Sequence, residues 1–403
     1  MTAQQRSFIA LAVASSAVVA VAFGLRNSLG LFISSINSST TLGYATISFA
    51  FAVMQLMWGV SQPIAGAMND RWGPRPVLLG GALLLAGATA LIPFATSAGA
   101  LVLVLGVAFA SGAGTAGPAI LASAISRWIP ETKRSVANGM ITAGGSFGQF
   151  LIVPLAQLSI STAGWRAALV ILGGVALLSV PLVIYVTKGA SAAHTAHAQA
   201  GTLKQAIADA FRDPSYLLLT AGFFTCGFHI AFIATHLPGV VALCMLPPTV
   251  SAWSLSIIGL FNIFGALWVG RHIQAKRMKV ALSGLYFGRA LLILAFFFSP
   301  KTPIVFFIFS AGIGFTYLST VPPTIGLVAK LHGPRYLATL FGLVMLSHQV
   351  GGFLGAWLGG KAFEATGSYD WMWWADIALC IFAAVVHLPI REARPQLAAA
   401  AAA

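Results

Sequence analysis

"GAMNDRWGPRP", residues 66–76, is a charged break between two apolar runs, and it determines how the rest of the chain divides. The runs on either side, 43–67 and 76–96, carry almost no charge. Each has the length of about 20 residues that a helix needs to cross the hydrocarbon core of a bilayer. The break therefore indicates a short loop between two membrane-spanning helices.

The same alternation of apolar runs and polar breaks continues along all 403 residues. Hydrophobic residues make up 58% of the sequence and charged residues 7%, and the mean hydropathy is +0.90. A soluble protein needs far more charge to cover its surface, so these values exclude one. We expect an all-α, polytopic membrane protein with twelve transmembrane helices, at 8–36, 43–67, 76–96, 100–127, 135–160, 165–187, 214–241, 250–271, 279–299, 303–330, 336–360 and 370–390.

Lysine and arginine are distributed unevenly among the breaks. If the N-terminus lies in the cytoplasm, seventeen of the 22 basic residues fall in cytoplasmic breaks, and only Arg166, Lys301 and Lys361 fall in external ones. Cytoplasmic loops of membrane proteins are enriched in basic residues. The distribution predicts an integral protein of the bacterial cytoplasmic (inner) membrane with both termini inside. It also explains the net charge of +14 without a nucleic-acid partner.

One long polar break separates two sets of six spans. Within it, Leu203, Ile207 and Phe211 would share one face of a helix, which predicts a short amphipathic helix on the cytoplasmic surface. The expected organisation is an N-terminal six-helix bundle at 1–187, a cytoplasmic linker at 188–213, a C-terminal six-helix bundle at 214–394 and a tail at 395–403.

The charged break at 66–76 resembles the loop signature of the major facilitator superfamily. The matching residues are Gly66, Asp70, Arg71, Gly73 and Arg75. The resemblance implies the major facilitator fold, in which spans 1, 4, 7 and 10 line a central cavity and this loop latches the two halves together. The corresponding loop between spans 8 and 9 keeps its basic residues and lacks the aspartate.

Span 5 begins with "KRSVANGMITAGGSFG", residues 133–148, which resembles the monocarboxylate-transporter and oxalate/formate-antiporter branch of that superfamily. Its basic pair, Lys133 and Arg134, is assigned to the same conformational latch. Close approach of helix backbones would by itself explain the glycines that follow. Span 8 departs from this branch, because Ala266 stands where the relatives carry a substrate-binding arginine and Asn262 where animal carriers have an aspartate.

Ionisable residues inside spans are functional candidates, because each costs roughly 2.5–3.5 kcal/mol to insert. Arg26 lies near the middle of span 1, close to where the resemblance places a lysine, and Arg26 and Asn27 are predicted to bind substrate. The alternative is an arginine bonded to helix carbonyls for structural reasons. His229 and His236 of span 7 and His348 of span 11 are predicted to couple transport to protons. His229 and His348 also join the predicted substrate site, and the alternative for each histidine is a neutral helix contact.

Span 10 is predicted to be interrupted, since its sequence "GFTYLSTVPPT", residues 314–324, contains a Pro-Pro pair. A broken helix frees backbone groups beside a cavity. Tyr317 of this span, Gln349 of span 11 and Asn262 of span 8 complete the predicted substrate site.

The acidic residues fall in loops and near span ends. Asp376 lies only a turn or two inside span 12, so we expect no acid at the membrane midplane. Arg289 of span 9 is expected to serve helix packing rather than substrate binding. A cavity lined by arginine and histidine without a carboxylate favours an anion.

These features predict a secondary active transporter of a small organic anion, a monocarboxylate by resemblance, coupled to protons and working by alternating access. We expect a monomer with neither a cofactor nor a metal. The alternative is a proton-driven exporter of hydrophobic or amphipathic compounds, against which the missing midplane acid argues. An enzyme is disfavoured because the sequence has no nucleophile–base pair, metal cluster or phosphate loop.

Overall fold

The computed structural model describes residues 8–125, 128–188, 203–275, 277–333 and 336–392, and this part of the chain is helical without strands. Most of the predicted linker and the whole predicted tail lie outside it. Eleven stretches are long and apolar enough to cross a membrane. The longest, Val136–Thr187, holds two spans, because Gly164 breaks the helix with φ +78°, a conformation that favours glycine. The described residues therefore hold twelve spans, the number predicted.

The first span changes its winding just beyond Arg26. α1 (Phe8–Ser28) tightens into the 3₁₀ turn η2 (Leu29–Phe32) and continues as α2 (Ile33–Ser39). At this point the Asn27 amide donates to the carbonyl of Phe23 and the Ser28 hydroxyl to that of Leu25, both at 2.8 Å. Such local side-chain bonds compete with regular helix geometry.

The other N-terminal elements supply spans 2 to 6. They are α3 (Tyr44–Trp72), α4 (Pro74–Leu91), η3 (Ile92–Phe94), α5 (Ala98–Leu101), the π-helical stretch η4 (Val102–Phe109), α6 (Ala110–Thr115), α7 (Pro118–Ile125), α8 (Glu131–Leu177) and α9 (Ser179–Thr187). The charged break lies at the junction of α3 and α4. Gly73, with φ +82°, ends α3, and Pro74 begins α4, where its missing N–H removes no helix bond.

The C-terminal elements begin with α10 (Leu203–Arg212), a short helix within the predicted linker. Spans 7 to 12 follow as α11 (Pro214–Leu243), α12 (Pro248–Ala275), α13 (Met278–Phe298), α14 (Pro303–Thr316) with α15 (Val321–His332), α16 (Leu337–Thr366) and α17 (Asp370–His387).

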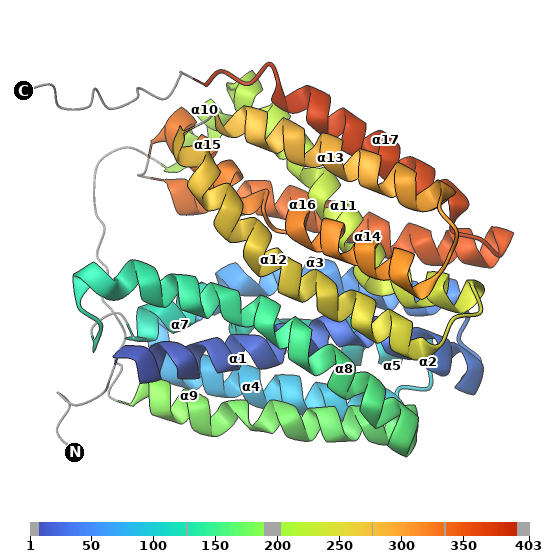
Figure 1. Ribbon diagram of the computed structural model, residues 1–403. Helices are drawn as coiled ribbons and strands as arrows, with labels where there is room; N and C mark the ends of the chain where they lie inside the picture. Colours follow the sequence, from blue (N-terminus) through green and yellow to red (C-terminus); the bar gives the residue numbers. More distant parts are fainter. Residues whose placement is uncertain (1–7, 126–127, 189–202, 276, 334–335, 393–403) are drawn as a thin grey trace, which may run out of the picture.

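Two groups of helices lie side by side in Figure 1, α1 to α9 below and α11 to α17 above. They meet along two long pairs, α3 with α16 and α8 with α12. We call the end of the molecule that carries α7, α10 and α15 the linker end, and the end that carries α2 and α5 the far end (Figure 1). At the far end, the Glu364 carboxylate of α16 accepts the backbone N–H of Ala45 in α3 at 3.2 Å and so ties the groups together.

Small residues allow the closest helix contacts, as the sequence suggested. A methyl group added at Gly144 or Gly148 of α8 would collide with the backbone of α1. Gly351 and Gly355 of α16 lie equally close to carbonyl groups of α11. Association of helices in lipid depends on such packing, because lipid tails are as apolar as leucine.

Candidate functional site

Arg26 lies in the last turn of α1, where the two helix groups meet. Its Nη2 donates a hydrogen bond to Gln55 Oε1 of α3, and its Cζ lies 4.5 Å from the ring centroid of Trp58. Phe23 meets the Trp58 ring edge-on, with centroids 5.7 Å apart. An amide and an aromatic face therefore hold the guanidinium. Within the described residues, no carboxylate forms an ion pair with it.

Several buried nitrogens around Arg26 lack a hydrogen-bond partner in the described chain. They are Nε of Arg26 itself, Nε2 of Gln349 and Nδ1 of His348. Gln349 packs against Gly59, on the face of α3 that also carries the partners of Arg26. His348 and Tyr317 lie within electrostatic reach of Arg26. Leaving buried donors unpaired is costly, so this arrangement suits a bound anion.

Two other predicted site residues donate hydrogen bonds within the protein. The Asn27 amide bonds its own helix, as described above, and the residue is 5% exposed. The Tyr317 hydroxyl donates to the carbonyl of Ile230 at 3.4 Å. Asn27 therefore shapes the end of α1, whereas Tyr317 joins the interrupted span 10 to α11.

The interruption predicted in span 10 lies between α14 and α15, immediately before the Pro-Pro pair. Asn262 of α12 accepts the freed N–H of Leu318 at 3.0 Å. The amide of Asn262 also donates to Ser146 Oγ of α8 at 2.7 Å. Asn262 thereby connects the break to the opposite helix group.

Arg289 holds the other side of this break and is fully buried. Its Nη2 donates to the carbonyl of Thr316 and, at 3.3 Å, to that of Tyr317. These carbonyls have lost their usual helical partners, and every backbone group in a membrane must be satisfied internally. This position agrees with the expected packing role of Arg289.

The expectation that no acid reaches the midplane is wrong. Asp376 is fully buried, and its Oδ2 lies 2.6 Å from Nδ1 of His229, near the middle of the 30-residue helix α11. Because α17 begins at Asp370 and has only 18 residues, a position two turns inside it is already deep in the span. His229 thus faces α17, away from the meeting of the two groups.

Cys380 completes a buried cluster with His229 and Asp376, whose ligand atoms lie within 4.8 Å of one another. Three such groups could in principle hold a metal ion. Arg289, however, is close enough to His229 to interact with it electrostatically. A guanidinium beside the cluster opposes a divalent cation, so the geometry fits a hydrogen-bonded pair better than a metal centre.

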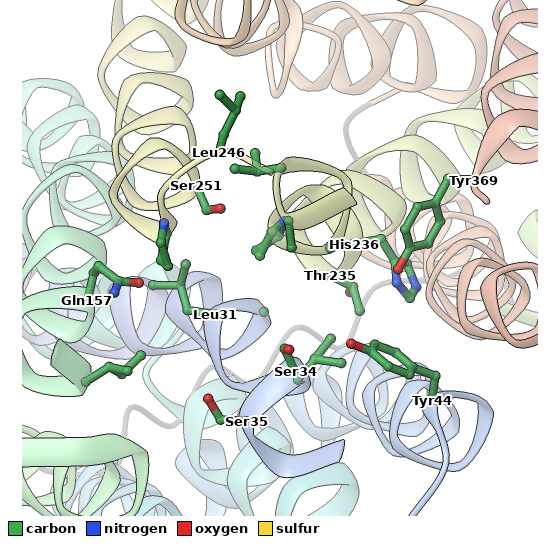
Figure 2. Close-up of a pocket in the computed structure, with 18 residues that line it drawn as sticks. Leu31, Ser34, Ser35, Tyr44, Gln157, Thr235, His236, Leu246, Ser251 and Tyr369 are labelled. Carbon is green, nitrogen blue, oxygen red and sulfur yellow. The ribbon is translucent and has the colours of Figure 1, made fainter. Parts of the chain in front are cut away.

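His236 lies two turns further along α11 in a different environment. Its Nε2 lies 2.7 Å from the carbonyl oxygen of Ala356, and its ring centroid lies 5.4 Å from that of Tyr369. Figure 2 shows both side chains at the edge of a pocket at the far end of the molecule. The two histidines of span 7 therefore lie in separate sites, His229 against Asp376 and His236 at the pocket, which their spacing alone did not reveal.

The predicted latch residues lie at the linker end, and Asp70, Arg71 and Arg75 are exposed there. Lys133 Nζ lies 4.6 Å from the ring centroid of Phe8 at the start of α1. Among the described residues, Asp70 forms no ion pair. The latching role of this group stays a prediction.

Comparison with known proteins identifies the family. The model of the Major Facilitator Superfamily matches residues 15–356, and the chain belongs to this superfamily. It is therefore an integral membrane transporter and not an enzyme.

Relatives extend over most of the chain at low identity. An uncharacterised MFS-type transporter, YcxA of Bacillus subtilis (strain 168), is 25% identical over 88% of this chain and 87% of its own. Monocarboxylate transporter 13 of Rattus norvegicus is 26% identical over 87% of this chain and 81% of its own. The oxalate:formate antiporter of Oxalobacter formigenes is 27% identical over 53% of this chain and 51% of its own.

The similarity to solved structures concerns the fold alone. The inward open conformation of the xylose transporter XylE from E. coli superposes with a TM-score of 0.74 at 13% identity, covering 97% of this chain and 98% of that one. A crystal structure of the D-xylose-proton symporter gives a TM-score of 0.71 at 14% identity, covering 96% and 98%.

Proposed function

We propose that this transporter carries a small organic anion, a monocarboxylate, and that this transport is coupled to a proton. The observation that carries the proposal is the state of Arg26, a cation between the helix groups that lacks a carboxylate partner among the described residues. Within the described chain, Nε of Arg26 and Nε2 of Gln349 have no hydrogen-bond partner, and both could donate to a carboxylate. The names of the relatives, which include monocarboxylate transporters and an oxalate:formate antiporter, support this substrate class.

The coupled proton would reside on the His229–Asp376 pair. This pair is fully buried, and Nε2 of His229 and Oδ1 of Asp376 are unpartnered in the described chain. A proton taken up there changes the charge of a site shielded from water. Such a change of charge has a large effect on the free energy of the site. The pair also neighbours Arg289, which holds the break in span 10.

Alternating access follows from the two helix groups, which would rock against each other along α3–α16 and α8–α12. The charge distribution supports a protein of the bacterial inner membrane with the linker end and both termini in the cytoplasm, and we propose that it works as a monomer. In this orientation the Glu364–Ala45 contact holds the external end together.

Uptake by the purified protein in proteoliposomes tests the proposal. A panel of labelled carboxylates is offered with and without an inward proton gradient, beside neutral and cationic solutes of similar size. We expect selective uptake of monocarboxylates that the gradient stimulates. Transport that shows no preference for anions would overturn the substrate class, and carboxylate uptake indifferent to the gradient would overturn the coupling.

A second candidate is export of hydrophobic or amphipathic compounds. One observation favours it: an apolar groove of about 480 Å³ between α8 and α12, lined by residues such as Leu151, Leu155 and Trp253. Acyl chains of the bilayer would also fill such a groove. Efflux of several dyes that Arg26→Gln leaves unchanged would favour the exporter over the anion carrier.

A further inference from the structure

The far-end pocket lies between the two helix groups and has a volume of about 190 Å³ (Figure 2). Tyr44 and Tyr369 direct their hydroxyl groups toward it, and His236 lies beside Tyr369 (Figure 2). Lysine, arginine, aspartate and glutamate are absent from its described lining. The lining includes polar side chains from both groups: Ser34, Tyr44, Gln157, Thr235, Ser251 and Tyr369.

Four of these side chains are buried and yet make no hydrogen bond within the described chain. Gln157 is 9% exposed, Thr235 2%, and Ser251 and Tyr369 3% each. Threonine on a helix commonly bonds the carbonyl four residues earlier, as Thr220 of α11 does at 2.8 Å. Thr235 does not, so its hydroxyl remains available to the pocket. Buried polar groups without partners are unfavourable unless a ligand or water completes them.

The chemistry of these groups selects a type of ligand. Hydroxyl and amide groups both donate and accept hydrogen bonds, and the described lining offers both kinds. A bare carboxylate only accepts hydrogen bonds and would prefer a cation, which the lining does not offer. Alcohol groups of a ligand donate and accept in the same way as the lining, so the pocket matches a hydroxylated molecule.

The pocket is separated from Arg26 by a tight backbone contact. Gly30, one turn beyond Arg26, lies against the carbonyl of Ala234, and an added methyl group would collide with it. Gly30 also borders the pocket. A ligand in the pocket therefore stands on the far-end side of this contact and cannot at the same time occupy the place beside Arg26.

We infer that the far-end pocket is a second binding site, for short carboxylates that carry hydroxyl groups. It holds them by their hydroxyls before the carboxylate reaches Arg26, and it thereby favours hydroxy acids over acids of the same length without hydroxyls. The carboxylate part of this inference rests on the proposed function. The hydroxyl part does not, and a neutral polyol shares that chemistry.

Binding and uptake of three probes separate these possibilities: glycerate, propionate and glycerol. The test variant is Thr235→Val with Ser251→Ala. The matched control is Thr162→Val with Ser159→Ala on α8, where Thr162 is exposed, Ser159 is half-buried and both hydroxyls bond their own helix. Equilibrium binding to the full-length protein in detergent is measured alongside proteoliposome uptake. The Arg26→Gln variant, which keeps the pocket, is included in both.

We expect the test variant to weaken glycerate binding by about tenfold, the effect of losing two hydrogen bonds, while propionate uptake and the control variant stay unchanged. Arg26→Gln should lose uptake of both acids and keep glycerate binding. Equal glycerate affinity in the wild type and the test variant overturns the pocket site. If glycerol binds as glycerate does and no carboxylate is transported, the hydroxyl site stands and both its carboxylate preference and the proposed function fall.

Discussion

Arg26 is an arginine whose charge is met by an amide and an indole ring. Gln55 and Trp58 stabilise its position without neutralising it, because neither carries a negative charge. A guanidinium inside a membrane is stable when a partner accepts its hydrogen bonds and balances its charge. The position of Arg26 between the helix groups makes a transported anion that partner under the proposed function.

Replacing Arg26 by glutamine should lower kcat/KM for carboxylate uptake roughly 10- to 100-fold, the effect of losing one charge-assisted hydrogen bond. Arg26→Lys should retain part of the activity, because it keeps the charge and loses the forked geometry. Initial rates in proteoliposomes measure both. Arg166→Gln at the exposed far end is the matched control. Unchanged uptake by Arg26→Gln would remove Arg26 from the site.

Asp376→Asn tests the proton pair. The amide keeps the size of the side chain and removes its charge, so the variant should lose stimulation of uptake by a proton gradient. Exchange of labelled for unlabelled substrate, which moves no net proton, should persist. Asp370→Asn, at the exposed start of the same helix, is expected to behave as the wild type. Gradient-stimulated uptake by Asp376→Asn would exclude the pair as the coupling site.

Sequence reasoning found the candidates of the site better than their partners. Arg26 and His229 are conspicuous because they interrupt apolar runs. Span 12 is predicted to begin at residue 370, and α17 does begin there, so the depth of Asp376 could be inferred from the sequence. Its role could not, because that depends on which face of α17 meets α11. The acid's position six residues into an 18-residue span was the available signal. The pocket hydroxyls gave no signal, since only side-chain orientation distinguishes them from other serines and threonines.

Among the elements, α16 offers a direct test of close packing. A methyl group at Gly355 would collide with the carbonyl of Phe228 in α11, whereas one at Gly342 meets nothing within 4 Å. Gly355→Ala should therefore destabilise the protein by about 1–3 kcal/mol. Gly342→Ala should leave stability equal or raise it by up to about 1 kcal/mol, because alanine favours helix. Thermal unfolding in detergent compares them, and equal melting temperatures would contradict the contact.

Helix boundaries could be predicted where a single residue decides them. The Pro-Pro pair predicted the break in span 10. The glycine of the charged loop, Gly73, ends α3 with a positive φ. The partners of the break, Arg289 and Asn262, come from spans 9 and 8 and depend on tertiary packing. The π-helical winding of η4 had no sequence signal that the spacing of apolar residues could supply.

At the scale of the whole molecule, the charge distribution predicts which end faces the cytoplasm. Arg75 at the linker end and Lys361 at the far end are both exposed, so each can be replaced by cysteine in a chain whose three cysteines are alanine. In intact bacterial cells an impermeant maleimide should label Lys361→Cys and spare Arg75→Cys. Permeabilised cells should show both labelled. The reverse pattern in intact cells would invert the orientation.

The buried charges of the spans also determine how the carrier responds to voltage. With neutral histidines, Arg26, Arg289 and Asp376 leave one net positive charge deep in the described spans. Under the proposed function, with one proton for each monocarboxylate, the bound pair adds no charge, so the loaded and the empty carrier would experience the same electrical force. Each elementary charge moved through the field is worth about 2.3 kcal/mol per 100 mV, and here the two half-cycles cancel. The chemical gradient of protons would therefore power accumulation, while the electrical potential of the cell would contribute nothing.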